Sequence, residues 1–139
     1  MIEVLNLTRQ RINTEKLLLM VRKILYLEKS GQWDISVCLI GARRMREINR
    51  KFRKKDAVTD VLSFGELQGP NGKTKLGQIM ICVHQVKKNA RALQKSFEEE
   101  LKSVLVHSVL HLLGYEHEKS KQKAHIMKQK EKEYEDKLA

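Results

Sequence analysis

Three histidines near the carboxyl-terminal end of the chain are the residues best suited to chemistry. They are His107, His111 and His117. The first two are four residues apart, so on a helix their imidazoles project from one face, a turn apart. The third follows Gly114, a residue type that commonly ends a helix and turns the chain back. Three neutral imidazoles can then converge with a fourth position left open, which is how a catalytic zinc site is built.

A pair of histidines on an apolar helix can also be purely structural. The segment around this pair is rich in leucine and valine, so a helix over residues 97–113 is predicted to be buried at the centre of the fold. Imidazoles beside a core are costly unless their lone pairs are satisfied, and a metal ion does this. Such ligands suit zinc, copper, nickel or iron, and zinc is the usual ion where no redox chemistry is evident. We therefore expect one Zn²⁺ ion.

The spacing of the histidines equals that of the metzincin peptidases, H-E-x-x-H-x-x-G-x-x-H. In those enzymes the glutamate after the first histidine is the general base, and Ser108 occupies that position here. A serine hydroxyl is too weak a base to activate a metal-bound water. A metallopeptidase is therefore the less favoured alternative, which would need another carboxylate as its base.

A basic segment is the second strong signal, in a chain whose net charge is +11. Residues 43–55 contain a single acid, Glu47, among eight basic residues: Arg43, Arg44, Arg46, Arg50, Lys51, Arg53, Lys54 and Lys55. This segment is called the basic cluster below. Positive charge concentrated in this way favours contact with the phosphates of a nucleic acid.

The elements that would position these residues follow from the hydrophobic pattern. Strands are expected at residues 2–7, 35–40, 58–64 and 76–83. Helices are expected at 15–27, 42–52, 86–93, 97–113 and 121–138, with a loop or hairpin connection at 65–73. Ser96 and Glu99 resemble a capping box for the helix at 97–113. The order β-α-β-α-β-β-α-α-α predicts an α+β fold in one domain over residues 1–139. Its mixed sheet of about four strands would be covered by helices, and a buried central helix would carry the histidines in a zincin-like site geometry.

The composition excludes several classes of protein. With 139 residues, 41% apolar and 32% charged, the chain is expected to be an ordinary globular domain. No apolar run approaches the ~20 residues that cross a bilayer, and the N-terminus lacks the form of a signal peptide. Cys38 and Cys82 sit in apolar stretches and are expected to fill the core as free thiols. These features predict a cytoplasmic protein without a membrane partner.

Three segments of the chain resemble the YbeY family, metal-dependent endoribonucleases of ribosomal RNA maturation. The family signature H-G-x-L-H-L-x-G-Y-D-H is matched by His107-Ser108-Val109-Leu110-His111-Leu112-Leu113-Gly114-Tyr115-Glu116-His117. An aromatic residue followed by R-x-K-D-x-x-T-D-V-L-S-F is matched by Phe52-Arg53-Lys54-Lys55-Asp56-Ala57-Val58-Thr59-Asp60-Val61-Leu62-Ser63-Phe64. The family's L-G-D-I is matched by Leu76-Gly77-Gln78-Ile79. The matches come in the family's order and the resemblance covers nearly the whole chain.

The resemblance implies a zinc-dependent endoribonuclease specific for single strands, active in 3′-end maturation of small-subunit rRNA and in ribosome quality control. It implies that His107, His111 and His117 bind zinc and that His107 and Arg53 are catalytic. The residues expected to contact the substrate are Arg43, Arg44, Arg50, Lys54, Lys55, Ser63 and Phe64. The expected partners are rRNA precursors and the ribosome or ribosome-associated proteins, and no DNA.

Several positions depart from the family pattern. Gln78 replaces an aspartate, and if that carboxylate orients a ligand histidine, a neutral amide would do so less strongly. Ser108 is expected to add a hydroxyl beside the first ligand and to narrow the site slightly. Gly65 stands where relatives often have proline and is expected in a loop. No general base is evident. These departures leave open an alternative function, a ribosome assembly or RNA-binding factor whose metal is mainly structural.

Overall fold

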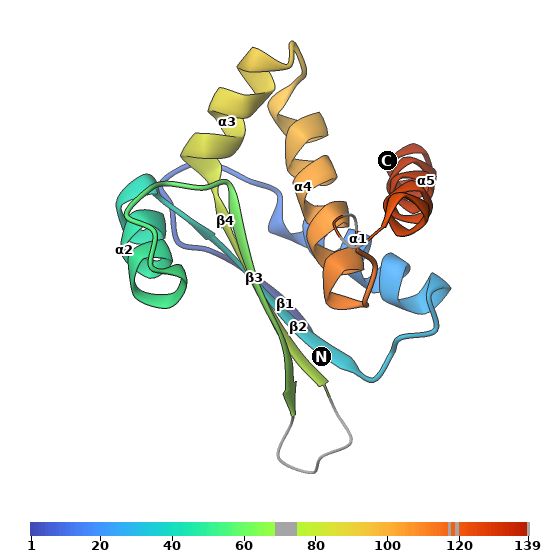
Figure 1. The fold of residues 1–139 in the computed structure, drawn as a ribbon. Coiled ribbons are helices and arrows are strands. Elements are labelled where there is room, and N and C mark those ends of the chain that lie inside the picture. Colours follow the sequence, from blue (N-terminus) through green and yellow to red (C-terminus); the bar gives the residue numbers. More distant parts are fainter. Residues whose placement is uncertain (69–74, 117, 119, 139) are drawn as a thin grey trace.

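The computed structural model describes residues 1–68, 75–116, 118 and 120–138. Its elements follow the order predicted from the sequence, and those within the described residues are β1 (Ile2–Asn6), α1 (Thr14–Leu27), β2 (Trp33–Ile40), α2 (Ala42–Arg53), β3 (Val61–Gln68), β4 (Lys75–Cys82), α3 (Val83–Ala92), α4 (Phe97–Leu112) and α5 (Lys121–Lys137). The predicted α+β class and single domain are confirmed, with one mixed sheet and helices packed on it (Figure 1).

The strands form one sheet in the order β1-β2-β4-β3. β1 pairs with β2 and β2 pairs with β4 in parallel, whereas β3 runs antiparallel to β4. The parallel connections pass through helices, as parallel pairs require, while β3 and β4 are consecutive in the chain. β3 is therefore the outer strand on one side of the sheet.

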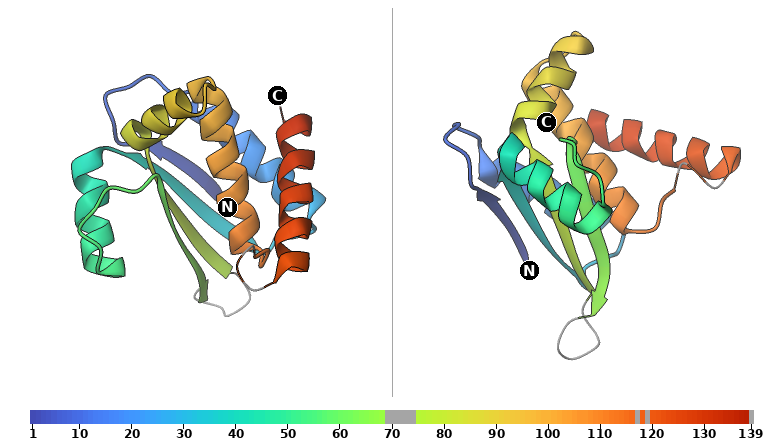
Figure 2. Two further views of the ribbon diagram at one scale, coloured as in Figure 1. Left: turned by 45° about the horizontal axis from the view of Figure 1, so that its top comes forward. Right: turned by 60° about the vertical axis from the view of Figure 1, so that its left-hand side comes forward.

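Side chains alternate between the two faces of the sheet, and each face has its own core. The larger core lies between the sheet and α1, α4 and α5, and its fully buried side chains include Ile35, Leu39, Ile79, Ile81, Leu105 and Tyr134. The smaller core lies beneath α2 on the opposite face and contains Cys38, Ile40, Met45, Leu62, Met80 and Cys82. Figure 2 shows α2 on one side of the sheet and α4 with α5 on the other. The basic cluster and the histidine helix thus lie on different faces.

The boundaries of β3 differ most from the sequence prediction. A strand was expected at residues 58–64 and a loop from Gly65, but β3 covers Val61–Gln68. The start moves because residues 54–60 form a loop held to α2, where Asn49 Nδ2 donates to the Ala57 carbonyl at 2.9 Å. α3 also begins earlier than expected, at Val83, directly after the last residue of β4. Residues 69–74, in the rest of the predicted connection, lie outside the described residues.

Two glycines allow the end of α4 to pack close to the sheet. A Cβ atom on Gly65 would lie 2.7 Å from Leu112 Cδ2, and one on Gly77 would lie 2.8 Å from Leu112 Cδ1 and 3.2 Å from Trp33 Cζ3. The expectation that Gly65 lies in a loop is therefore wrong. It lies within β3, where a larger side chain would push against the helix that carries the histidines.

The cysteines behave as the sequence predicted. Cys38 and Cys82 are buried and free, and both belong to the core beneath α2. Burial raises the pKa of the Cys82 thiol above its ordinary value, which suits a packing role. Across the described part of the chain, no helix is both long and apolar enough to cross a membrane.

Candidate metal and RNA site

The helix that carries the histidines begins and ends as its sequence predicted. The Ser96 hydroxyl accepts a hydrogen bond from the Glu99 backbone N–H at 3.1 Å, which caps the first turn of α4. Gly114, with a φ of 103°, follows the last turn, and the Tyr115 N–H returns to the Leu110 carbonyl at 3.1 Å. The chain therefore turns away from α4 at Gly114, three residues after His111.

His107 and His111 stand next to each other on α4. Their rings are parallel within 1°, with 6.5 Å between the ring centres, the adjacency that the four-residue spacing predicted. The Nδ1 atom of His107 lies 3.3 Å from Glu131 Oε1 of α5. With its hydrogen on Nδ1, this imidazole donates to the carboxylate and presents the Nε2 lone pair as a metal ligand. This donor chemistry fits the predicted zinc ion.

A second carboxylate lies close to His107. A hollow of about 260 Å³ between the start of β3, α4 and α5 is lined by Asp60, Val61, Ser103, Val104, His107 and Glu131. Asp60 is held there by its neighbours, because Thr59 Oγ1 donates to one carboxylate oxygen at 3.4 Å and Asn89 Nδ2 to the other at 3.5 Å. Two carboxylates and an imidazole thus share this hollow.

Neither carboxylate was identified from the sequence. Asp60 belongs to the T-D-V-L-S-F motif, so its place in that motif was a signal that could have identified it. Glu131 lies in a helix of mixed charge, where nothing distinguishes it from its solvated neighbours. Its contact with His107 joins residues 24 positions apart, and only the packing of α5 on α4 reveals it.

The third predicted ligand, His117, lies outside the described residues. Within the described ranges, no group of three histidine, cysteine or acidic side chains is arranged to hold a metal ion. The full ligand set of His107, His111 and His117 therefore remains a prediction from the sequence.

Ser108 does not face the histidine site. It is 1% exposed, and its hydroxyl donates to the Val104 carbonyl at 2.7 Å within α4. The expectation that it narrows the site is therefore not met, because position 108 points into the core. A hydroxyl placed and occupied in this way cannot serve as the base of a peptidase.

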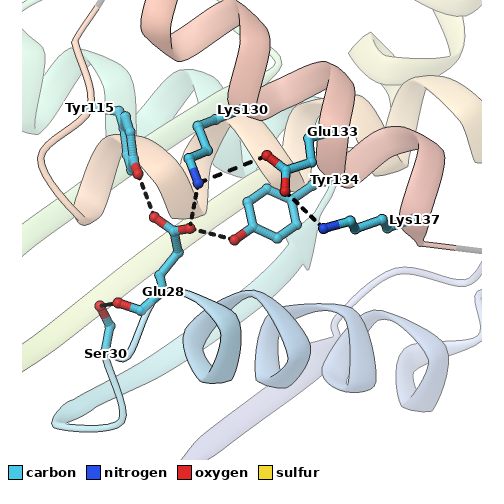
Figure 3. A network of polar contacts seen from close by, with 7 residues as sticks. All are labelled: Glu28, Ser30, Tyr115, Lys130, Glu133, Tyr134 and Lys137. Atoms are coloured by element: carbon cyan, nitrogen blue, oxygen red, sulfur yellow. Dashed lines mark hydrogen bonds and ion pairs between the residues drawn. The ribbon is translucent and has the colours of Figure 1, made fainter.

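Tyr115, which follows the end of α4, is fastened by the half-buried carboxylate of Glu28, the residue directly after α1. The hydroxyls of Tyr115 and Tyr134 each donate to it at 2.5 Å, and Lys130 Nζ lies 3.3 Å away (Figure 3). Burial alone would raise the pKa of Glu28, but the hydrogen bonds from Tyr115, Tyr134 and Lys130 outweigh it and lower this pKa. Burial and the bond to Glu28 raise the pKa of Tyr115 to about 12. Tyr115 belongs to the histidine signature, so Glu28 anchors a residue of this signature just beyond the end of α4.

Arg53, the predicted catalytic arginine, lies at the outer edge of the sheet. It is the last residue of α2, which ends where Lys54 takes a left-handed conformation with a φ of 59°. Arg53 Nη2 donates to the Ser63 carbonyl of β3 at 2.8 Å, and its guanidinium lies 5.0 Å from the centre of the Phe64 ring. Arg53 therefore lies at the free edge of β3, against Phe64 of the face that α2 covers.

The structure separates three residues that the sequence placed in one site. Ser63 and Phe64 are consecutive in β3, so their side chains point to opposite faces and cannot line a single groove. Gln78 is the cross-strand neighbour of Phe64 and lies on the same face, away from α4. The expectation that position 78 faces the histidines is therefore wrong. The amide of Gln78 consequently gives no reason to expect weaker orientation of a ligand histidine.

The basic cluster follows the exposed surface of α2 and the loop after it. All eight basic side chains are exposed. Arg46 is paired with Asp56 at 2.7 and 3.2 Å, and Arg43 lies 3.5 Å from Glu47. The predicted contacts divide between the ends of α2, since Arg43 and Arg44 lie about 15 Å along the helix from Arg53 and Lys54. The second end adjoins the outer edge of β3, where Arg53 binds the Ser63 carbonyl.

Comparisons with known proteins identify the family to which this chain belongs. The family model described as Endoribonuclease YbeY matches residues 3–139. Endoribonuclease YbeY of Thermodesulfovibrio yellowstonii is 37% identical over 94% of this chain and 92% of its own length. Endoribonuclease YbeY of Campylobacter jejuni is 39% identical over 74% of both chains. The solution structure of TM1509 from Thermotoga maritima matches with a TM-score of 0.69 and 31% identity, over 99% of this chain and 89% of that one. The chain therefore belongs to the YbeY family of endoribonucleases, as its three motifs predicted.

Proposed function

We propose that this protein is a zinc-dependent endoribonuclease that cleaves single-stranded RNA in ribosomal RNA precursors. Its role would be 3′-end maturation of small-subunit rRNA and ribosome quality control in the cytoplasm. The observation that carries the proposal is the position of the edge strand β3. Arg53 binds the outer edge of this strand. The start of the strand lines a hollow together with His107, Asp60 and Glu131. Membership of the YbeY family supports the same reaction.

The proposed roles follow from the chemistry of each side chain. His107, His111 and His117 would hold one zinc ion, which when bound lowers the pKa of a water so that it can attack a phosphodiester near neutral pH. Arg53 would donate to the non-bridging oxygens of the phosphate as negative charge develops there. Its bond to Ser63 uses one of five guanidinium N–H groups, so other donors remain for the substrate.

The substrate would approach along the basic cluster. Arg43, Arg44, Arg50, Lys54 and Lys55 are exposed on one surface and would contact successive phosphates of the strand. The partners proposed are rRNA precursors together with the ribosome or ribosome-associated proteins. DNA and membranes are not proposed as partners.

The test is cleavage of a single-stranded RNA by zinc-loaded protein. His107→Ala should abolish turnover, and Arg53→Ala should slow it by about 100-fold, the usual effect of removing one donor to a developing negative charge. Arg22→Ala, which removes an exposed arginine from α1, is the matched control and should cleave like the wild type. Equal rates in all variants would point to a contaminating nuclease.

The same experiment separates the proposal from the assembly-factor alternative. A protein that binds RNA and is stabilised by zinc, yet shows no turnover with any metal, would be a binding factor with a structural ion. Metal analysis of the purified protein, alongside cleavage with and without that metal, identifies the ion.

A further inference from the structure

A second hollow lies on the face of the sheet opposite the histidines, between α2 and strands β3 and β4. Its volume is about 420 Å³, and its lining is apolar apart from one amide: Ile48, Phe52, Phe64, Gln78 and Met80. Its lining contains none of the described residues of the metal site, namely His107, His111, Asp60 and Glu131. Its composition, aromatic and apolar with one group that both donates and accepts, is that of a small-molecule or base-binding site.

One aromatic wall of this hollow, Phe52, is open to solvent, whereas the other, Phe64, is partly buried. Phe52 lies on α2 at a helical spacing from the buried Met45, yet it is 58% exposed. Its ring meets that of Phe64 edge-on, with 5.7 Å between the ring centres and 67° between the planes. An aromatic ring as exposed as Phe52 is a surface on which a flat ring can stack.

Positive charge surrounds the same aromatic pair. Arg53 lies 5.0 Å from the centre of the Phe64 ring, and Lys51 Nζ lies 5.4 Å from that of Phe52. Aromatic rings that stack bases, flanked by cations that follow the phosphates, are how proteins bind single-stranded nucleic acid. A hydrophobic protein partner would gain nothing from these cations, so charge complementarity favours RNA.

We infer that this hollow binds one unstacked base of a single-stranded RNA, a step that rests on the proposed function. The base stacks on the exposed ring of Phe52, beside Phe64, and the exposed amide of Gln78 hydrogen-bonds to the base edge. Arg53 places a cation between this hollow and the free edge of β3, because its guanidinium lies over Phe64 and binds the Ser63 carbonyl. A strand that passes over this edge has a base in the hollow and a neighbouring phosphate at Arg53.

The inference is tested with short phosphorothioate-linked single-stranded RNAs that resist cleavage, each with 2-aminopurine at a different position. The fluorescence of this base falls when it stacks. With zinc-loaded wild-type protein, one position should be quenched far more than the others. Phe52→Ala should remove that quenching and weaken binding by about five- to 100-fold, whereas Phe52→Tyr should retain both.

Two controls make the result specific. Tyr26→Ala removes an aromatic side chain that is 80% exposed on α1, and it should bind the oligonucleotides like the wild type. Thermal unfolding of Phe52→Ala should match that of the wild type, because an exposed ring contributes little to the core. Gln78→Leu should bind with its order of preference among the four bases changed.

The possible outcomes distinguish this inference from the proposed function. RNA that binds without quenching at one position, or with quenching unaffected by Phe52→Ala, overturns the base site and leaves the endoribonuclease proposal intact. The hollow would then suit a protein partner. If no variant, including the wild type, binds RNA, the proposed function fails together with the base site.

Discussion

At the scale of single residues, the contact between His107 and Glu131 determines which nitrogen of the His107 imidazole can bind a metal ion. A carboxylate on one ring nitrogen fixes the tautomer and makes the other nitrogen a better metal ligand. The side chains of His107 and Glu131 are 36% and 23% exposed, so solvent does not fully screen their interaction. The last helix of the chain therefore contributes to the site without carrying a predicted ligand.

Replacement of Glu131 by glutamine should lower zinc affinity by about tenfold, because the amide can hold the ring but carries no charge. Affinity is measured by competition with a chromogenic chelator. The control is Asp136→Asn, which makes the same change of charge at an exposed position of α5. Equal affinities in the two variants would show that Glu131 does not orient His107.

At the scale of elements, the carboxylate of Glu28 fastens α1 to α5 and to the segment after α4 (Figure 3). Lys102 adds a second attachment, with Nζ donating to the carbonyls of Glu135 at 2.7 Å and Leu138 at 3.0 Å. Both attachments lie in the second half of α5, from Lys130 onward, which is the half that contains Glu131. This explains how a helix of mixed charge can place Glu131 reliably beside α4.

The Glu28 network should make stability depend on acid pH. The pKa of Glu28 is lowered in the folded protein, so its contribution is full above its ordinary value of 4.5 and is lost as the pH falls through the folded-state value. Glu28→Gln should cost about 1–3 kcal/mol at pH 7, and less at a pH below 4. Urea unfolding at both pH values measures this. A constant difference between the two proteins would contradict an ionised Glu28 as the cause.

The close packing of α4 on the sheet predicts a cost for any side chain at position 77. Gly77→Ala should destabilise the protein by about 1–3 kcal/mol, since the new methyl group meets Leu112 and Trp33. Gly31→Ala is the control, because nothing lies within 4 Å of a Cβ there. In urea unfolding, the double variant Gly77→Ala with Leu112→Ala should lose less stability than the sum of the single variants. Strict additivity would argue against this contact.

The sequence predicted those features that depend on local pattern. Hydrophobic periodicity located the helices and strands, and Ser96 and Gly114 marked the ends of the histidine helix. Gly65 was misread because a glycine more often marks a turn than a strand beneath a helix. The placement of Gln78 on the other face followed from strand register, and the Glu131 contact from tertiary packing. Neither of these is determined by neighbouring residues.

At the scale of the whole molecule, charge and chemistry are divided between the two faces of the sheet. α2 carries the basic cluster on one face, and α4 carries the histidines on the other (Figure 2). The end of α2 at Arg53 binds the outer edge of β3. An RNA strand that contacts both the basic cluster and the histidines would therefore cross the edge of the sheet at β3. The phosphate contacts along α2 would then affect the affinity for RNA more than the rate of cleavage.

Binding of single-stranded RNA should weaken steeply with salt, by about 0.7 in logarithmic slope for each phosphate contact. Arg50→Ala should reduce the slope by about this amount. Arg46→Ala should reduce it less, because Asp56 already neutralises that guanidinium. Fluorescence anisotropy over a range of salt concentrations measures both. A salt-independent affinity would exclude the basic cluster as the RNA surface.

The hydrogen bond from Arg53 to Ser63 also affects how separate copies of the protein meet. β3 is the outermost strand on its side of the sheet, and uncovered edge strands add to the sheets of other molecules unless charge blocks them. Arg53 places a cation on this edge. Arg53→Ala should therefore self-associate at concentrations where the wild type does not, which light scattering detects, while Arg53→Lys should resist this. The side chain proposed to hold a phosphate would then also guard the molecule against aggregation.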